Sequence, residues 1–258
     1  MGDPSTASDR ENVARYYDRL AANYGDGEFS GARRAAVLTA IADTIACPRR
    51  VLDLGCGNGA FAVEFAARIP DAHVVGMDLS PHMLRVATRR RIGHADFLRG
   101  DAGALPFGPG TFDLVFMSHV LMLVPNMERC VAGIAQCLVP GGYFVATIGI
   151  GAWRHLLGPL PQALLQIRSF FEPRTLRTFD DETRAGAACT AAGLQPEIRR
   201  APFAVGWSAL EEWIRIRWLT SLAAPLRRIA GLLLPAMRWR ATGRTVELAE
   251  TVLVATKR

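Results

Sequence analysis

The sequence predicts an α/β protein built on a doubly wound, mostly parallel sheet. Short apolar runs of strand length alternate with helical patterns, and a glycine-rich turn follows the first run. The expected strands of this region are 50–55, 73–78, 95–99, 112–118 and 142–149. Strands that are apolar throughout belong to a parallel sheet covered by helices on both faces, which indicates this fold class.

The stretch VLDLGCGNG at 51–59 is the centre of the expected fold. An apolar strand containing Asp53 leads into a turn with Gly55 and Gly57, and a helical pattern covers 60–69. Glycine lets the backbone adopt positive φ and lie close against a ligand. The following helix presents unpaired N–H groups at its start, so we expect a ligand at this turn.

Charge indicates which ligand this is. Residues 55–60, GCGNGA, also fit the dinucleotide-binding pattern G-x-G-x-x-G/A. However, Asp53 lies beside the loop, Asp78 ends the second strand and Asp101 follows the third. A pyrophosphate would be repelled there, whereas S-adenosylmethionine (SAM) has no phosphate and carries an ammonium and a sulfonium. The sequence therefore favours SAM over a nicotinamide or flavin dinucleotide.

Four blocks of the chain resemble the class I SAM-dependent methyltransferases. VLDLGCGNG resembles their motif I, and 74–84, 100–124 and 137–146 resemble the later blocks in the same order and spacing. The subgroup that the chain resembles is methyltransferase type 11, which contains many small-molecule, quinone and natural-product enzymes. The resemblance implies a Rossmann-like sheet of seven strands whose last strand is antiparallel.

The resemblance also implies cofactor contacts. Asp53 faces the ammonium of SAM, the two glycines of the loop lie against its methionine part, and Asp78 accepts from the ribose hydroxyls. Adenine then contacts the side chain after Asp78 and the residues around Asp101. The expected cofactor-binding residues are Tyr24, Asp53, Gly55, Gly57, Asp78, Leu79, Asp101, Ala102 and Ser118. No metal site is expected, because none of the five cysteines has C-x-x-C spacing.

His119 is the candidate catalytic residue. It follows Ser118 at the end of the fourth strand, where the family places residues that face the acceptor. A neutral imidazole there takes a proton from a phenol, hydroxyl or acid; the alternative is that it only lines the pocket. The [N/D/S]-P-P-[Y/F/W] motif of nucleic-acid amino-methyltransferases is absent, so no nucleic-acid partner is expected.

We expect one domain over 1–258. Its parts are a disordered start at 1–10, cap helices within 11–45 (11–24 and 31–45) and a cofactor-binding core at 46–150, with segments that cover the acceptor at 151–180 and 205–243. Further elements are expected at 80–91, 127–138, 180–192, 196–204 and 247–256. The second covering segment forms a helical lid, at 209–222 and 225–240, between the last two strands. The covering segments contain all five tryptophans, which favours a hydrophobic or aromatic acceptor.

The sequence thus predicts transfer of a methyl group from SAM to a small hydrophobic or aromatic acceptor, through oxygen or nitrogen. Two alternatives stay open. Residues 199–244 are rich in arginine, which suits a quinone or lipid methyltransferase that docks on a membrane surface. The chain could also be a SAM-binding scaffold or regulator without turnover. Without an apolar leader or spanning segment, a cytoplasmic location is expected, with peripheral membrane contact and the oligomeric state left open.

Overall fold

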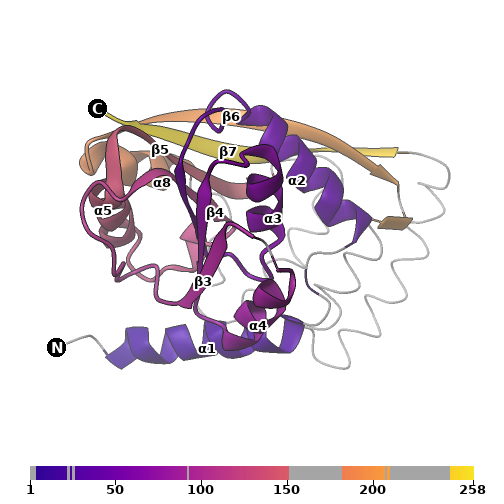
Figure 1. Ribbon diagram of the computed structural model, residues 1–258, viewed down its shortest axis with the longest axis horizontal. Coiled ribbons are helices and arrows are strands. Elements are labelled where there is room, and N and C mark those ends of the chain that lie inside the picture. Colours follow the sequence, from indigo (N-terminus) through magenta and orange to yellow (C-terminus); the bar gives the residue numbers. More distant parts are fainter. Residues whose placement is uncertain are drawn as a thin grey trace.

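A computed structural model of the protein describes residues 4–21, 24, 27–91, 93–150, 182–206, 208–209 and 245–258. Its centre is a sheet of seven strands in the order β3-β2-β1-β4-β5-β7-β6 (Figure 1). The strands are β1 (Arg50–Leu54), β2 (His73–Asp78), β3 (Ala95–Arg99), β4 (Phe112–Ser118), β5 (Leu138–Ile150), β6 (Leu194–Gly206) and β7 (Thr245–Lys257). The pairings from β3 to β5 are parallel, and β7 is antiparallel to both of its neighbours. The expected fold class is confirmed.

Helices on the two faces of the sheet enclose two hydrophobic cores. They are α1 (Pro4–Leu20), α2 (Glu28–Ala40), α3 (Ala60–Arg68), α4 (Pro81–Arg89), α5 (Met127–Cys137) and α8 (Glu182–Ala191), with a short 3-10 turn at Leu121–Leu123. Figure 1 shows α2 and α3 on one side of the strands and α5 and α8 on the other. Phe61, Phe65 and Phe116 pack in the first core, and Val131, Ile134 and the α8 alanines in the second. The central strands β1 and β4 are therefore covered on both faces, as apolar strands require.

Local capping residues mark the ends of three helices. Ser80 begins α4, and its Oγ accepts a hydrogen bond from the Met83 N–H at 3.1 Å. Asn126 begins α5 in the same way, accepting from the Arg129 N–H at 2.8 Å. Gly193 follows α8 with φ of 80°, a conformation that favours glycine at a helix end. These caps fix where the strand-to-helix connections begin and end.

Some element boundaries differ from the sequence expectation. The chain is helical from Pro4, so the expected disorder was wrong for 4–10; proline at a first helical position is already set to a helical φ. Helix α2 covers Glu28–Ala40 rather than 31–45. β6 and β7 are longer than predicted, because the two pair along their whole length from Leu194↔Lys257 to Gly206↔Thr245.

The covering segments expected at 151–180 and 205–243 lie almost entirely outside the described residues. The lid helices expected at 209–222 and 225–240 fall outside the described residues, except for helical backbone at 208–209. All five tryptophans lie outside them as well. Within the described part of the chain, no helix has the length and apolar character needed to cross a bilayer.

Candidate active site

The expected site residues gather at the carboxyl ends of β1, β2 and β4. Because β7 runs antiparallel, its first residues also lie at this edge of the sheet, and Glu250 pairs with Ile150 at the end of β5. The edge lies beside the change in strand order between β1 and β4, where doubly wound sheets bind their ligands.

The glycine loop after β1 has the conformation that its sequence demands. Gly55, Gly57 and Gly59 have φ of 75°, 54° and 77°. A Cβ on Gly55 would lie 2.2 Å from the Val120 side chain, so a larger residue would collide as well as strain the turn. A Cβ on Gly57 would instead lie 3.7 Å from the Tyr24 ring, which places that tyrosine beside the loop as expected.

Asp53 is the most buried charge of this loop region, with 1% of its surface exposed. One oxygen, Oδ2, has no hydrogen-bond partner among the described residues. Burial raises the pKa of Asp53 to about 8, helped by the nearby charge of Asp78 and opposed by the Ala62 N–H. A buried acceptor without a partner is costly, and a ligand ammonium would satisfy it. The carboxylate therefore fits the positive methionine end of SAM.

Asp78 ties the end of β2 to the glycine loop. Its two oxygens accept from the Gly57 N–H at 2.9 Å and from the Ser80 N–H at 2.8 Å. Burial raises the pKa of Asp78, although both of these hydrogen bonds oppose the shift. Each carboxylate oxygen can accept more than one hydrogen bond, so ribose hydroxyls remain compatible with this arrangement.

Asp101 has a partner that the sequence did not reveal. Its Oδ1 accepts from the Gly103 N–H at 2.8 Å, and its Oδ2 lies 3.0 Å from Arg10 Nη1 on α1. A second contact of α1 joins Asp18 to the Ser80 hydroxyl. Helix α1 is thus held across the ends of β2 and β3. Of these two contacts, one is with the expected site residue Asp101 and the other is with Ser80, two positions after Asp78.

The remaining expected cofactor residues lie near this loop. Leu79 directly follows Asp78, Ala102 is buried behind Asp101, and Ser118 ends β4. Asn58, which was not predicted, is 2% exposed, and its side-chain amide donates to the Tyr24 carbonyl. An amide within the glycine motif was the available signal for this residue, but its partner is 34 positions away.

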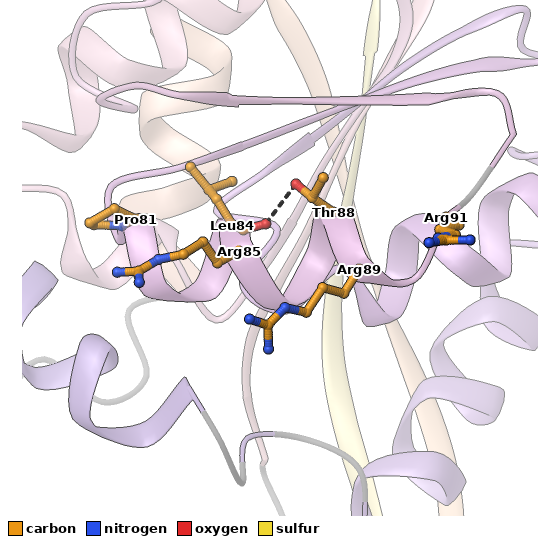
Figure 2. A pocket seen from close by; sticks show the side chains of 6 residues that line it. All are labelled: Pro81, Leu84, Arg85, Thr88, Arg89 and Arg91. Atoms are coloured by element: carbon orange, nitrogen blue, oxygen red, sulfur yellow. Dashed lines mark hydrogen bonds between the residues drawn. The ribbon is translucent and has the colours of Figure 1, made fainter.

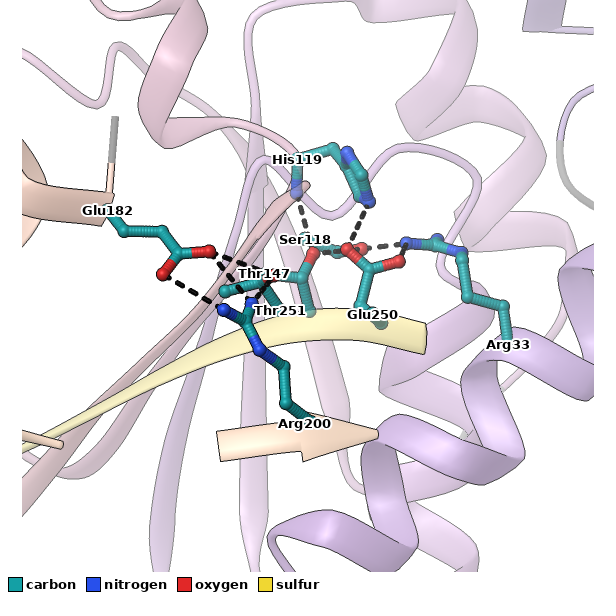
Figure 3. A network of polar contacts seen from close by, with 8 residues as sticks. All are labelled: Arg33, Ser118, His119, Thr147, Glu182, Arg200, Glu250 and Thr251. Atoms are coloured by element: carbon teal, nitrogen blue, oxygen red, sulfur yellow. Dashed lines mark hydrogen bonds and ion pairs between the residues drawn. The ribbon is translucent and has the colours of Figure 1, made fainter. Parts of the chain in front are cut away.

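His119 lies in a polar network at the end of β4 (Figure 3). Its φ is 57°, which is unusual for a residue other than glycine. Thr147 on β5 holds this conformation, because the His119 N–H donates to both the carbonyl and the hydroxyl of Thr147, at 3.2 and 3.1 Å. The His119 ring nitrogen Nε2 lies 2.7 Å from Oε1 of Glu250.

Glu250 is the centre of this network. The side chain is fully buried, and its second oxygen, Oε2, lies 3.4 Å from Arg33 Nη1 on α2. Arg33 also donates to the Ser118 hydroxyl at 3.3 Å. Burial alone would raise the pKa of Glu250, but the positive charges of His119 and Arg33 outweigh it and lower the pKa. The carboxylate is therefore held in its charged form.

Two residues of this network were not among the expected site residues. Arg33 contacts Glu250 of the protein. Glu250 was not predicted, because a glutamate in a strand belongs to no motif. It is one of two charged residues in the otherwise mostly apolar strand VELAETVLVA, and only the register of β7 against β5 places it beside His119.

A separate groove lies on the surface of α4 (Figure 2). It has a volume of about 450 Å³ and is open to solvent. Its walls are formed by Pro81, Leu84, Arg85, Thr88, Arg89 and Arg91. None of these is an expected site residue, and the groove lies along the helix rather than at the strand ends, so it is distinct from the candidate active site.

Comparison with known proteins finds methyltransferases that are similar to this chain. A family profile described as a methyltransferase domain matches residues 52–146, which contain the glycine loop, Asp78, Asp101 and His119. A trans-aconitate 2-methyltransferase of Methylobacterium nodulans is 31% identical over 70% of this chain and 72% of its own length. A demethylmenaquinone methyltransferase of Thermus thermophilus is 36% identical over 52% of this chain. The chain spans only 60% of the length of that second relative.

The fold comparison is consistent with the sequence relationship. The crystal structure of the YcgJ protein from Bacillus subtilis superimposes with a TM-score of 0.62, covering 87% of this chain and 98% of that one at 17% identity. A likeness at this identity concerns the fold alone. Together with the glycine loop and the acidic strand ends, the sequence matches show that the chain belongs to the class I SAM-dependent methyltransferases, type 11 group.

Proposed function

We propose that the protein transfers a methyl group from SAM to a small hydrophobic or aromatic acceptor, through oxygen or nitrogen, with His119 as the general base. The observation that carries the proposal is the pairing of two features at one edge of the sheet. A buried acidic loop suits the cofactor, because one Asp53 oxygen has no hydrogen-bond partner among the described residues, and a histidine backed by a carboxylate lies next to it.

SAM supplies an activated methyl group on a sulfonium. The chain's own residues have simpler tasks: the glycine loop and the carboxylates hold the cofactor, and the residues at the end of β4 meet the acceptor. In-line methyl transfer then depends mainly on alignment and on exclusion of water. A base is needed when the acceptor must lose a proton. The family relationship supports a small-molecule acceptor, since the relatives described above are named for such acceptors.

The test is release of S-adenosylhomocysteine from SAM labelled in its methyl group, in the presence of a panel of phenols, amines and carboxylic acids. Turnover of at least one small acceptor is expected, with label recovered in the product. Calorimetry on the same protein separates the alternatives. Tight SAM binding without label transfer to any acceptor would instead support a non-catalytic SAM-binding scaffold.

The name of one relative favours a second candidate, a quinone methyltransferase that docks on membranes. The arginine-rich sequence at 199–244 would suit an anionic lipid surface. Sedimentation with vesicles of phosphatidylglycerol and phosphatidylcholine tests this. Salt-sensitive pelleting, together with methylation of a quinol only when vesicles are present, would favour this candidate over a freely diffusing acceptor.

A further inference from the structure

We infer that Asn58 is a positioning residue of the cofactor site, which holds the Tyr24 ring against the glycine loop and thereby sets the affinity for SAM. The inference goes beyond the proposed function, because it requires only that SAM binds and assumes nothing about the acceptor. It follows from the contacts that join the glycine loop, the end of α4 and the segment after α1.

The backbone around Asn58 is held from two sides. The Gly57 N–H donates to Asp78 at the end of β2, at 2.9 Å. The Asn58 carbonyl accepts from Arg90 Nε, at the end of α4, at 2.7 Å. The Asn58 side chain is 2% exposed. A buried side chain on a backbone held in this way keeps one orientation, so it can serve as a fixed point for another segment.

Tyr24 depends on such a fixed point. It lies in a bend between α1, which ends at Leu20, and α2, which begins at Glu28. The Asn58 side-chain amide donates to the Tyr24 carbonyl. Tyr17 of α1 packs edge-to-face against the Tyr24 ring, with the ring centroids 5.7 Å apart. One contact acts on the backbone of Tyr24 and the other on its ring, so both contribute to where the ring lies.

The Tyr24 ring lies against the glycine loop. A Cβ on Gly57 would be 3.7 Å from Cε1 and 4.0 Å from Cδ1 of Tyr24, which are ordinary van der Waals distances. The ring therefore borders the loop at the glycine that is expected to lie against the methionine part of SAM. An aromatic side chain at this place excludes water from the cofactor and suits its positive charges.

Helix α1 has anchors of its own. Arg10 contacts Asp101, and Asp18 contacts the Ser80 hydroxyl, so the helix is held beside α4 (Figure 1). These contacts fix the helix, whereas Asn58 contacts the residue that faces the loop. Loss of the Asn58 side chain should therefore weaken SAM binding while α1 stays docked.

A double-mutant cycle measured by calorimetry tests the inference without an acceptor. Asn58→Ala removes the donor and Tyr24→Ala removes the ring, and each should weaken SAM binding about tenfold. The combined variant should bind SAM within about twofold of Tyr24→Ala alone, because the ring that Asn58 positions is already gone. Asn12→Ala removes an exposed contact with Arg15 within α1, and as the matched control it should bind SAM like the parent.

Independent effects would contradict this role of Asn58. Single losses that multiply to about a hundredfold in the combined variant would overturn the inference, since Asn58 would then act without Tyr24. Unchanged SAM affinity in either single variant, with folding checked by circular dichroism, would overturn it as well.

Asn58→Asp provides a second variant of the same shape. Its carboxylate cannot donate to the Tyr24 carbonyl at pH 8, whereas the protonated acid can donate at pH 5. The loss of SAM affinity, relative to the parent at the same pH, should therefore shrink as the pH falls. A loss that stays constant between pH 8 and pH 5 would count against the hydrogen bond and overturn the inference.

Hydrogen exchange of the parent decides the question even if the variants at position 58 do not fold. SAM should protect the peptide that contains residues 55–59 and the peptide that contains Tyr24 with the same midpoint concentration. Protection of the loop without protection of the Tyr24 peptide would overturn the inference. Methyl transfer to the acceptor panel is measured separately, so its failure would contradict the proposed function and leave these binding results in force.

Discussion

Binding of SAM should release a proton from Asp53, and this can be measured without knowing the acceptor. Asp53 is buried, one of its oxygens has no partner in the part of the chain that the structure describes, and its pKa is raised from 3.8 to about 8. At pH 7, a group with that pKa is about 90% protonated in the free protein. The ammonium of SAM favours the ionised form, so each binding event at pH 7 should release about 0.9 of a proton.

The pH dependence of SAM affinity follows from the same pKa of Asp53. If Asp53 is ionised in the complex over the whole range, the apparent association constant scales with the ionised fraction in the free protein. That fraction is about one half at pH 8 and about one hundredth at pH 6, so SAM should bind about fiftyfold more weakly at pH 6. The same shift makes Asp53 a stabilising group for the free protein below about pH 4, and this contribution is lost as the pH rises through about 8.

Calorimetry in phosphate and in Tris at pH 7 gives the proton count, because the two buffers have different heats of ionisation. In Asp53→Asn, which keeps the shape but cannot titrate, binding should be weaker at pH 8 and nearly independent of pH. Asp96→Asn, at an exposed position on β3, is the control and should behave like the parent. Identical apparent enthalpies in both buffers for the parent, or equal SAM affinity at pH 6 and pH 8, would refute the reasoning.

Three further changes test the rest of the site. Asp78→Ala removes charge-assisted hydrogen bonds and should weaken SAM binding about ten- to a hundredfold by calorimetry; unchanged affinity would contradict the role of Asp78. Gly55→Ala should lower the free energy of unfolding by about 1–3 kcal/mol more than Gly141→Ala, since both have positive φ but only Gly55 faces the Val120 side chain; equal losses in denaturant titrations would show that no collision occurs. His119→Ala should lower kcat about 10²- to 10⁴-fold with SAM affinity retained, and a loss under tenfold at every pH would reduce His119 to a lining residue.

Local signals were enough to predict much of the molecule. The apolar runs and the glycines at 55, 57 and 59 act over a few residues, so they can be recognised along the chain. The strand ends that carry Asp53, Asp78 and Asp101 follow from the same patterns. The same signals make the methyltransferase family recognisable from the sequence, because the family's motifs lie in those loops.

Only the tertiary structure determined which carboxylate contacts His119 and which helix contacts Asp101. Glu250 is 131 positions from His119 and meets it only because β7 runs antiparallel beside β5. Arg10 reaches Asp101 because α1 crosses the strand ends. A buried glutamate in an apolar strand would be destabilising by local rules, and it is tolerated because Arg33 and His119 approach it from other elements. Such compensation depends on register and packing, which no short stretch of sequence specifies.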